Sequence, residues 1–188
     1  MNNKEMISVF DMLKIGVEPS SSHTLGPWKA AIRWIEELKD SNRFNNVKGL
    51  KVDLYGSLSL TGKGHATDIA SVLGLCGYDP VTFDVSIIDD TINNIKTKNR
   101  INFNQEKEID FNFQQDITFN KKFLPFHPNG IKFTALLEND KKSSSTFYSI
   151  GGGFVVKEER KNAKKKKEAF QSFPFSIEKA TDLVEFCK

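Results

Sequence analysis

The pattern of apolar and polar residues predicts three helices in the first half of the chain. Residues 7–15 carry apolar side chains at spacings of three and four, which fits a short helix that Gly16 ends. Residues 27–40 predict a clearer helix, with Pro27 in the first turn, where its missing N–H costs little. One face of this segment is apolar and consists of Trp28, Ala31, Ile32, Ile35 and Leu38. Residues 65–77 predict a third helix, whose inward side chains are Ile69, Val72, Leu73 and Cys76.

Alternation of apolar and polar residues predicts the strands. It is clear over 49–60 and again over 101–119, where Phe or Ile alternates with polar residues, as expected of half-exposed strands. Residues 131–138 and 145–156 predict two further strands, joined by a hairpin turn at 139–140. The order helix, helix, strand, helix, strands favours an α+β fold, with helices packed on a mostly antiparallel sheet.

Composition indicates one folded domain and excludes several classes of protein. The chain has 188 residues, 38% of them hydrophobic, and 16 of them are Phe, which is enough for a real core. The net charge of +3 does not indicate a nucleic-acid partner. The four lysines at 164–167 lack the interleaved aromatic residues of nucleic-acid surfaces, so a solvated linker is the simpler interpretation. The chain contains no run of 18 apolar residues, so the sequence predicts no membrane span.

The chain is expected to be cytoplasmic. Residues 1–13 include Glu5 and Asp11 and lack a small-residue cleavage site, so they do not resemble a signal peptide. Cys76 and Cys187 are far apart in the sequence and form no local metal motif, which makes a reducing compartment the simplest interpretation.

A sharp change of composition after Val156 predicts a domain boundary. We expect one domain over 1–157, a charged linker over 158–175 and the start of an amphipathic helix over 176–188. This last helix has no later partner in the chain, so we expect it to lead into a further domain that this chain lacks.

The three histidines, His23, His65 and His127, are the first candidates for chemistry. Each is flanked by Gly, Ser, Pro or Asn, which build exposed turns, and none lies on an apolar helix face. A single such histidine is commonly a solvated loop residue, whereas three of them in loops of this composition are typical of a site. Their spacings match no zinc motif.

Residues 19–27, PSSSHTLGP, place several hydroxyl groups at a predicted helix start. Free backbone N–H groups there, with Ser20, Ser21, Ser22 and Thr24 nearby, would suit a carboxylate or phosphate ligand. The simpler alternative is that one hydroxyl caps the helix. A cap needs only one residue, so the remaining hydroxyls favour an anion.

Two glycine-rich segments are further candidates. The turn 62–64 delivers Lys63 and His65 to a second helix start. Asp68 either orients the His65 ring or only favours the helix N-terminus. Residues 149–154, SIGGGF, either let a backbone approach a ligand closely or form a bulge or sharp bend in the sheet.

Four motifs, in this order, resemble a known family. They are SVFDMLKIGVEPSSSHTLGP at 8–27, GSLSLTGKGHATD at 56–68, HPNG at 127–130 and YSIGGGFV at 148–155. Together they resemble the N-terminal β domain of the iron–sulfur-dependent L-serine dehydratases over about residues 6–156. One departure is Glu18, where the family usually has Gly before PSSSHT.

The resemblance implies a two-part enzyme that converts L-serine into pyruvate and ammonia. In the family, cysteines of a separate catalytic domain hold a four-iron, four-sulfur cluster, which acts as a Lewis acid on the serine hydroxyl. This chain has two cysteines, so we expect the 4Fe-4S cluster to be ligated outside it and the chain itself to bind no cofactor. The expected partner is the catalytic α domain, in the same polypeptide or as a separate subunit, and the full enzyme is expected to be a homodimer. The fold is expected to be similar to the allosteric substrate-binding domain of some phosphoglycerate dehydrogenases.

The resemblance and the loop positions together suggest roles for single residues. His65 is the expected base for the α-proton of serine, with Lys63 as a charge partner, and His127 is the competing candidate for the base. His127 and Asn129 would close the site from another loop. The other expected substrate-binding residues are Ser20, Ser21, Ser22, His23, Thr24, Gly151 and Gly152. The alternative hypothesis is a non-catalytic regulatory module that binds an amino acid or small anion through the same loops.

Overall fold

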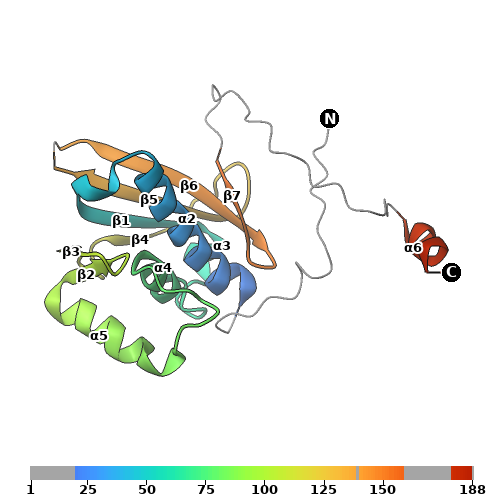
Figure 1. Ribbon diagram of the computed structural model, residues 1–188, viewed down its shortest axis with the longest axis horizontal. Helices are drawn as coiled ribbons and strands as arrows, with labels where there is room; N and C mark the ends of the chain where they lie inside the picture. The colour runs from blue at the N-terminus through green and yellow to red at the C-terminus, as the bar shows by residue number, and fades with distance from the viewer. Residues whose placement is uncertain (1–19, 139, 159–178, 188) are drawn as a thin grey trace. The chain divides into compact units, whose positions relative to one another are not determined.

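The computed structural model describes residues 20–138, 140–158 and 179–187 (Figure 1). The chain divides into two compact units, Met1–Glu158 and Glu159–Lys188. In the second unit the described element is the short helix α6 (Ala180–Phe186). The sheet, the core and the candidate site all belong to the first unit.

The described part of the first unit is built on a seven-stranded sheet with β1 (Val47–Gly56) at its centre. The other strands are β2 (Arg100–Phe103), β3 (Lys107–Asp110), β4 (Ile117–Asn120), β5 (Asn129–Leu137), β6 (Lys142–Gly151) and β7 (Phe154–Lys157). Their order is β2-β3-β1-β5-β6-β7, and β4 also pairs with β1. β3 and β4 run parallel to β1, whereas the pairs β1–β5, β5–β6, β6–β7 and β2–β3 are antiparallel. The predicted α+β fold with a mostly antiparallel sheet is therefore confirmed.

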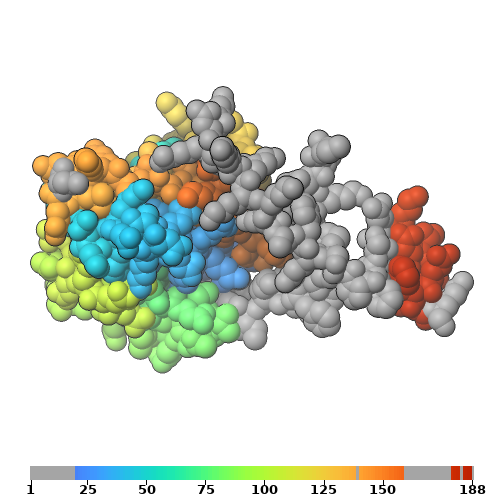
Figure 2. Space-filling view, turned by 45° about the horizontal axis from the view of Figure 1, so that its top comes forward, coloured from blue at the N-terminus to red at the C-terminus, as the bar shows by residue number. Residues whose placement is uncertain are grey.

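Helices pack against this sheet. They are α2 (Gly26–Asp40), α3 (Ser57–Leu60), α4 (Thr67–Leu75) and α5 (Ile88–Lys98), together with the short turns η1 (Ser21–Leu25), η2 (Phe44–Asn46) and η3 (Val85–Ile87). α2 packs against α4 and against β5, β6 and β7. In Figure 2 its blue surface lies between the orange surface of the β6 region and the green surface of the α5 region.

The core lies between α2 and the sheet. Trp34 is 1% exposed and stacks on Phe133 of β5, with 5.3 Å between the ring centroids. The inward face predicted for this helix is buried at Trp28, Ala31, Ile35 and Leu38, and partly buried at Ile32. Alternation on β1 and β5 buries Val52, Leu54, Ile131, Phe133 and Ala135. Each large side chain buried in this way stabilises the fold by about 1.5–3 kcal/mol.

The strand predicted over 49–60 is wrong at its C-terminal end. β1 ends at Gly56, whose φ of 55° turns the chain, and residues 57–60 form α3 instead. A β-carbon on Gly56 would lie 2.3 Å from the Pro128 carbonyl oxygen, so a side chain would not fit at this turn.

Other elements also differ from the sequence-based prediction. The segment 145–156 forms two strands rather than one, because Gly151, Gly152 and Gly153 all have positive φ and reverse the chain between β6 and β7. The helix α5 had not been predicted. The helix predicted over 7–15 lies outside the described residues. Among the described helices, none is long and apolar enough to cross a membrane.

Candidate functional site

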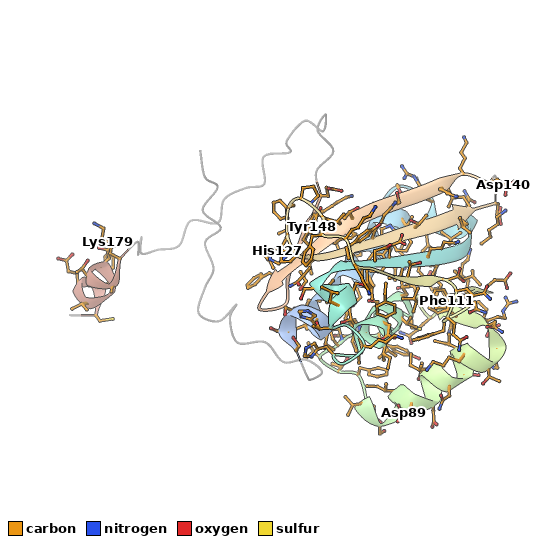
Figure 3. The ribbon with its side chains drawn as sticks, turned by 180° about the vertical axis from the view of Figure 1, so that it is seen from behind. Asp89, Phe111, His127, Asp140, Tyr148 and Lys179 are labelled. Atoms are coloured by element: carbon orange, nitrogen blue, oxygen red, sulfur yellow. The ribbon has the colours of Figure 1, made fainter. Side chains whose placement is uncertain are left out.

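Loops from four parts of the first unit meet at one end of the sheet. η1 leads into α2, residues 56–66 follow β1, residues 126–129 lead into β5, and the turn 151–153 joins β6 to β7. The start of α2, α3 and the β6–β7 turn lie at this end in Figure 1. In Figure 3 the label of His127 lies at the same end, opposite that of Asp140. All four sequence motifs thus contribute to one region.

The serine loop, residues 20–25, is a helical turn continuous with α2. The Ser20 carbonyl accepts a hydrogen bond from the Thr24 N–H at 2.9 Å, and Ser20 Oγ accepts one from the His23 N–H at 3.3 Å. Ser20 therefore caps this turn, as the simpler of the two interpretations expects. Ser21 is exposed, so the cap does not account for every hydroxyl in the loop.

The His23 imidazole is held between two serine hydroxyls. Its Nδ1 lies 3.0 Å from Ser22 Oγ, and its Nε2 lies 3.0 Å from Ser57 Oγ. The centroid of its ring is 5.1 Å from that of His65. Burial lowers the pKa of His23, the neighbouring His65 lowers it further, and the interaction with the Ser57 backbone opposes both effects. His23 is therefore neutral near pH 7.

His65 lies in the turn between α3 and α4, and its Nδ1 is buried without a hydrogen-bond partner. Thr24 Oγ1 donates a 3.0 Å hydrogen bond to the His65 carbonyl oxygen, which ties this turn to the serine loop. Asp68 Oδ1 accepts a hydrogen bond from the Ile69 N–H at 3.0 Å and does not hold Nδ1 of His65. Asp68 thus serves the start of α4, one of the two roles proposed for it.

The turn that carries Lys63 is tightly packed at Gly62 and open at Gly64. A β-carbon on Gly62 would lie 2.0 Å from the Leu58 carbonyl oxygen, whereas one on Gly64 would meet its nearest neighbour at 3.5 Å. The Lys63 ammonium group is 5.5 Å from the centroid of the Phe119 ring, a cation–π distance. Its predicted role as a charge partner of the base stays a prediction.

His127 and Asn129 are joined to each other and to β6. The Asn129 N–H donates a 3.1 Å hydrogen bond to Nδ1 of His127, so the neutral His127 ring carries its proton on Nε2. The Asn129 side-chain amide donates a 3.0 Å hydrogen bond to the Ser149 carbonyl oxygen. Asn129 is buried, and its side chain connects the loop before β5 to the strand that ends in the glycine turn.

The glycine turn is both a bend in the sheet and an open position. The pairing of β6 with β7 shifts register between Ser149 and Gly151, as the bulge interpretation expects. A β-carbon on Gly153 would lie 2.7 Å from Leu25 Cδ2, so the turn packs closely on the serine loop. A β-carbon on Gly151 would have no atom within 4 Å. Substrate contacts by Gly151 and Gly152 stay predictions.

Comparison with known proteins identifies the family. The family model described as serine dehydratase beta chain matches residues 8–160, most of the chain and all four motifs. The chain belongs to the serine dehydratase beta chain family.

Several relatives of this family are similar in sequence. An L-serine dehydratase of Haemophilus influenzae is 44% identical over 135 residues, which cover 71% of this chain and 30% of the relative. L-serine dehydratase 1 of Escherichia coli is 42% identical over 131 residues, which cover 69% of this chain and 29% of the relative. The chain thus spans about 30% of the length of these relatives.

The donor groups of the residues that the structure describes do not fit an iron–sulfur cluster. Within the described residues, no three His, Cys, Asp or Glu side chains gather in a group that could hold a metal ion. Burial raises the pKa of the Cys76 thiol to about 12, which disfavours the thiolate that binds iron. Cys187 is exposed and belongs to the other compact unit.

The roles of two residues of the site, Ser57 and Ser149, were not predicted from the sequence, although both lie in segments that it marked. Ser57 bonds to the His23 ring, but the alternation over 49–60 had assigned it to a strand. Ser149 accepts the hydrogen bond of Asn129 through its carbonyl oxygen, and its own hydroxyl is buried without a partner. The signal that could have found Ser57 is the preceding Gly56, because a glycine at the end of a strand often marks a turn into a loop.

Proposed function

We propose that this chain is the β part of an L-serine dehydratase and supplies polar residues to the site at which L-serine is converted into pyruvate and ammonia. The family assignment and the names of the relatives support this proposal. The observation that carries it is the His65 imidazole, which lies beside the neutral His23 where the four motifs meet and has a buried Nδ1 without a hydrogen bond.

The reaction needs a base. Elimination breaks the Cα–H and Cβ–O bonds of L-serine: the α-proton goes to the base, the hydroxyl leaves as hydroxide, and one proton, in net the one removed from Cα, converts the hydroxide into water. The remaining 2-aminoacrylate takes up water, releases ammonia and becomes pyruvate. An imidazole can accept the α-proton at neutral pH.

His65 is better suited to this role than His127. Nδ1 of His127 already accepts the Asn129 N–H, and its Nε2 carries the proton, so neutral His127 can donate a hydrogen bond but has no free lone pair. Both nitrogens of His23 face serine hydroxyls. Among the described residues, no hydrogen bond occupies Nδ1 of His65, whereas Nδ1 of His127 accepts one, so the ring of His65 is less committed to protein partners. It therefore takes the α-proton.

The substrate carboxylate lies at the serine loop. Ser21 is exposed there, and Ser22 and Thr24 border it on the side of the two histidines. Two further groups lie on loops at the same end of the sheet: Nε2–H of His127 and the open position at Gly151. They complete the proposed contacts with the substrate. Lys63, Ser20 and Gly152 stay in the candidate set.

The 4Fe-4S cluster of the full enzyme belongs to the catalytic α part. When bound there, it supplies Lewis-acid activation of the serine hydroxyl. The residues of this chain position the carboxylate, hold the proton and cover the site. A cytoplasmic location, a homodimeric full enzyme and the domain limits 1–157, 158–175 and 176–188 stay predictions.

The test compares this chain alone, its catalytic partner alone and the two together, under anaerobic conditions after cluster reconstitution. We expect cluster absorbance with the catalytic partner and pyruvate formation from L-serine only when both are present. Pyruvate formation by this chain alone would contradict the proposal. Full activity of the partner alone, changed in degree by this chain and L-serine, would favour the regulatory module instead.

A further inference from the structure

Ser57 occupies a junction between three loops of the site. Its hydroxyl faces Nε2 of His23 at 3.0 Å, and its backbone N–H donates a 2.9 Å hydrogen bond to the Pro128 carbonyl oxygen, next to His127. Its own carbonyl accepts hydrogen bonds from the N–H and the hydroxyl of Thr61, at 3.1 and 3.0 Å. A single residue thus connects the serine loop, the His127 loop and the turn that leads to His65.

The position of Ser57 is fixed by the backbone. Gly56 has a left-handed φ of 55°, and a β-carbon there would lie 2.3 Å from the Pro128 carbonyl oxygen. The chain can make this close approach only with glycine. As a result, the Ser57 hydroxyl has little freedom to move away from the His23 ring.

The hydrogen bonds of His23 form a chain from Ser22 to Ser57. Each serine hydroxyl can donate or accept, whereas a neutral imidazole donates from one nitrogen and accepts at the other. One serine hydroxyl therefore donates to the ring and the other accepts from it, so the two serines together select a single neutral tautomer of His23.

We propose that Ser57 is a positioning residue that holds the neutral His23 ring in one orientation and one tautomer beside His65. The His23 ring is 5.1 Å from the His65 ring, so a rotated or protonated His23 would place a polar N–H or a positive charge next to the base. A positive charge at this distance would weaken the ability of His65 to accept a proton. The expected effect of Ser57 on catalysis rests on the proposed function, whereas its effect on the His23 ring does not.

The structural test uses this 188-residue chain and nitrogen-15 NMR of the His23 side chain. We expect one and the same neutral tautomer in the wild type and in Ser57→Thr, which keeps the hydroxyl. We expect a mixture or the other tautomer in Ser57→Ala. Ser59→Ala is the matched control in α3, because no hydrogen bond joins Ser59 to a histidine in the part of the chain that the structure describes. An unchanged His23 tautomer in Ser57→Ala would overturn the proposal, whether or not the chain has a role in serine elimination.

The kinetic test uses the complete enzyme. Ser57→Ala should lower kcat by about 10–100-fold, the usual cost of removing a hydrogen bond that orients a functional imidazole, and Ser57→Thr should restore most of it. The double variant Ser57→Ala/His23→Ala should be no slower than His23→Ala alone, because both changes remove the same interaction. Independent, multiplicative losses in the double variant would overturn the proposed route through His23.

Discussion

Gly26 and Ser149 pack so closely that a β-carbon on Gly26 would lie 1.9 Å from Oγ of Ser149 and 2.7 Å from its Cβ. Gly26 begins α2 and Ser149 lies near the end of β6, and Ser149 is only 1% exposed. This contact sets how near the serine loop lies to the glycine turn.

The contact predicts a specific loss of stability. Gly26→Ala should lower the free energy of unfolding by about 1–3 kcal/mol, the usual cost of overpacking, measured by urea denaturation. Adding Ser149→Gly should restore part of the loss, because it removes both atoms of the clash. Gly64→Ala is the control and should change stability by less than about 0.5 kcal/mol, since its nearest neighbour is at 3.5 Å. If Gly26→Ala and Gly64→Ala lowered the free energy of unfolding equally, the contact between Gly26 and Ser149 would not be the cause of the loss.

The assignment of the base predicts the behaviour of two histidine variants of the complete enzyme. His65→Ala should lower kcat by roughly 10²–10⁴-fold, the range that loss of a general base usually costs. His127→Ala should have a smaller effect on proton removal, because Nδ1 of His127 is occupied by the Asn129 N–H. Exchange of the α-deuterium of labelled L-serine separates the two roles. Exchange that persists without His65 and disappears without His127 would reverse the assignment.

The environment of His23 predicts acid sensitivity of the fold. Burial and the neighbouring His65 hold its pKa below the ordinary value of 6.5, so the unfolded chain binds a proton at this residue more readily than the folded chain. The contribution of His23 to the free energy of unfolding is fully present above pH 6.5. It is lost as the pH falls through the lower pKa that His23 has in the folded state. The free energy of unfolding should therefore fall below pH 6.5, and by less in His23→Gln. An identical pH dependence in the variant would contradict this account.

The two cysteines predict unequal thiol reactivity. Cys76 is buried with a pKa raised to about 12, whereas Cys187 is exposed. A thiolate-specific reagent should therefore modify one thiol per native chain rapidly and the second only after denaturation. Cys187→Ser should abolish the rapid reaction. Rapid modification of native Cys187→Ser would show that the core around Cys76 opens easily.

The regular elements were largely predictable from local patterns. The helix over 26–40 follows from one apolar face, and β5 follows from alternation, because burial on one side of each is a local property of the sequence. The missed elements depend on less visible signals. α5 carries helix signals: buried Ile92 and Ile95 at helical spacing, acidic residues in the first turn and basic residues in the last. Its apolar face is short, however, and a strand-like pattern follows it directly, so the sequence did not predict this helix.

The candidate site was predictable as a set of loops but not as a geometry. Glycine, serine and proline around each histidine marked the loops correctly. The 5.1 Å separation of His23 and His65 depends on how η1 and the turn after α3 pack, and 42 residues separate them in sequence. Ser57 was missed because alternation continues through Gly56, while the positive φ that ends β1 leaves no trace in an apolar–polar pattern.

The far end of the β5–β6 hairpin lies at a distance from the candidate site. The strands pair from Gly130 and Tyr148 near the site to Leu136 and Lys142, about 20 Å along the sheet at the usual rise per residue. Asp140, beyond that last pair, has a side chain 88% exposed, and its ion pair with Lys48 is of the surface kind that contributes at most about 1 kcal/mol. A fluorescent dye attached to Cys in an Asp140→Cys variant that also carries Cys187→Ser would therefore sit about 20 Å from the candidate site, where it could report the docking of the proposed catalytic partner without altering a candidate residue.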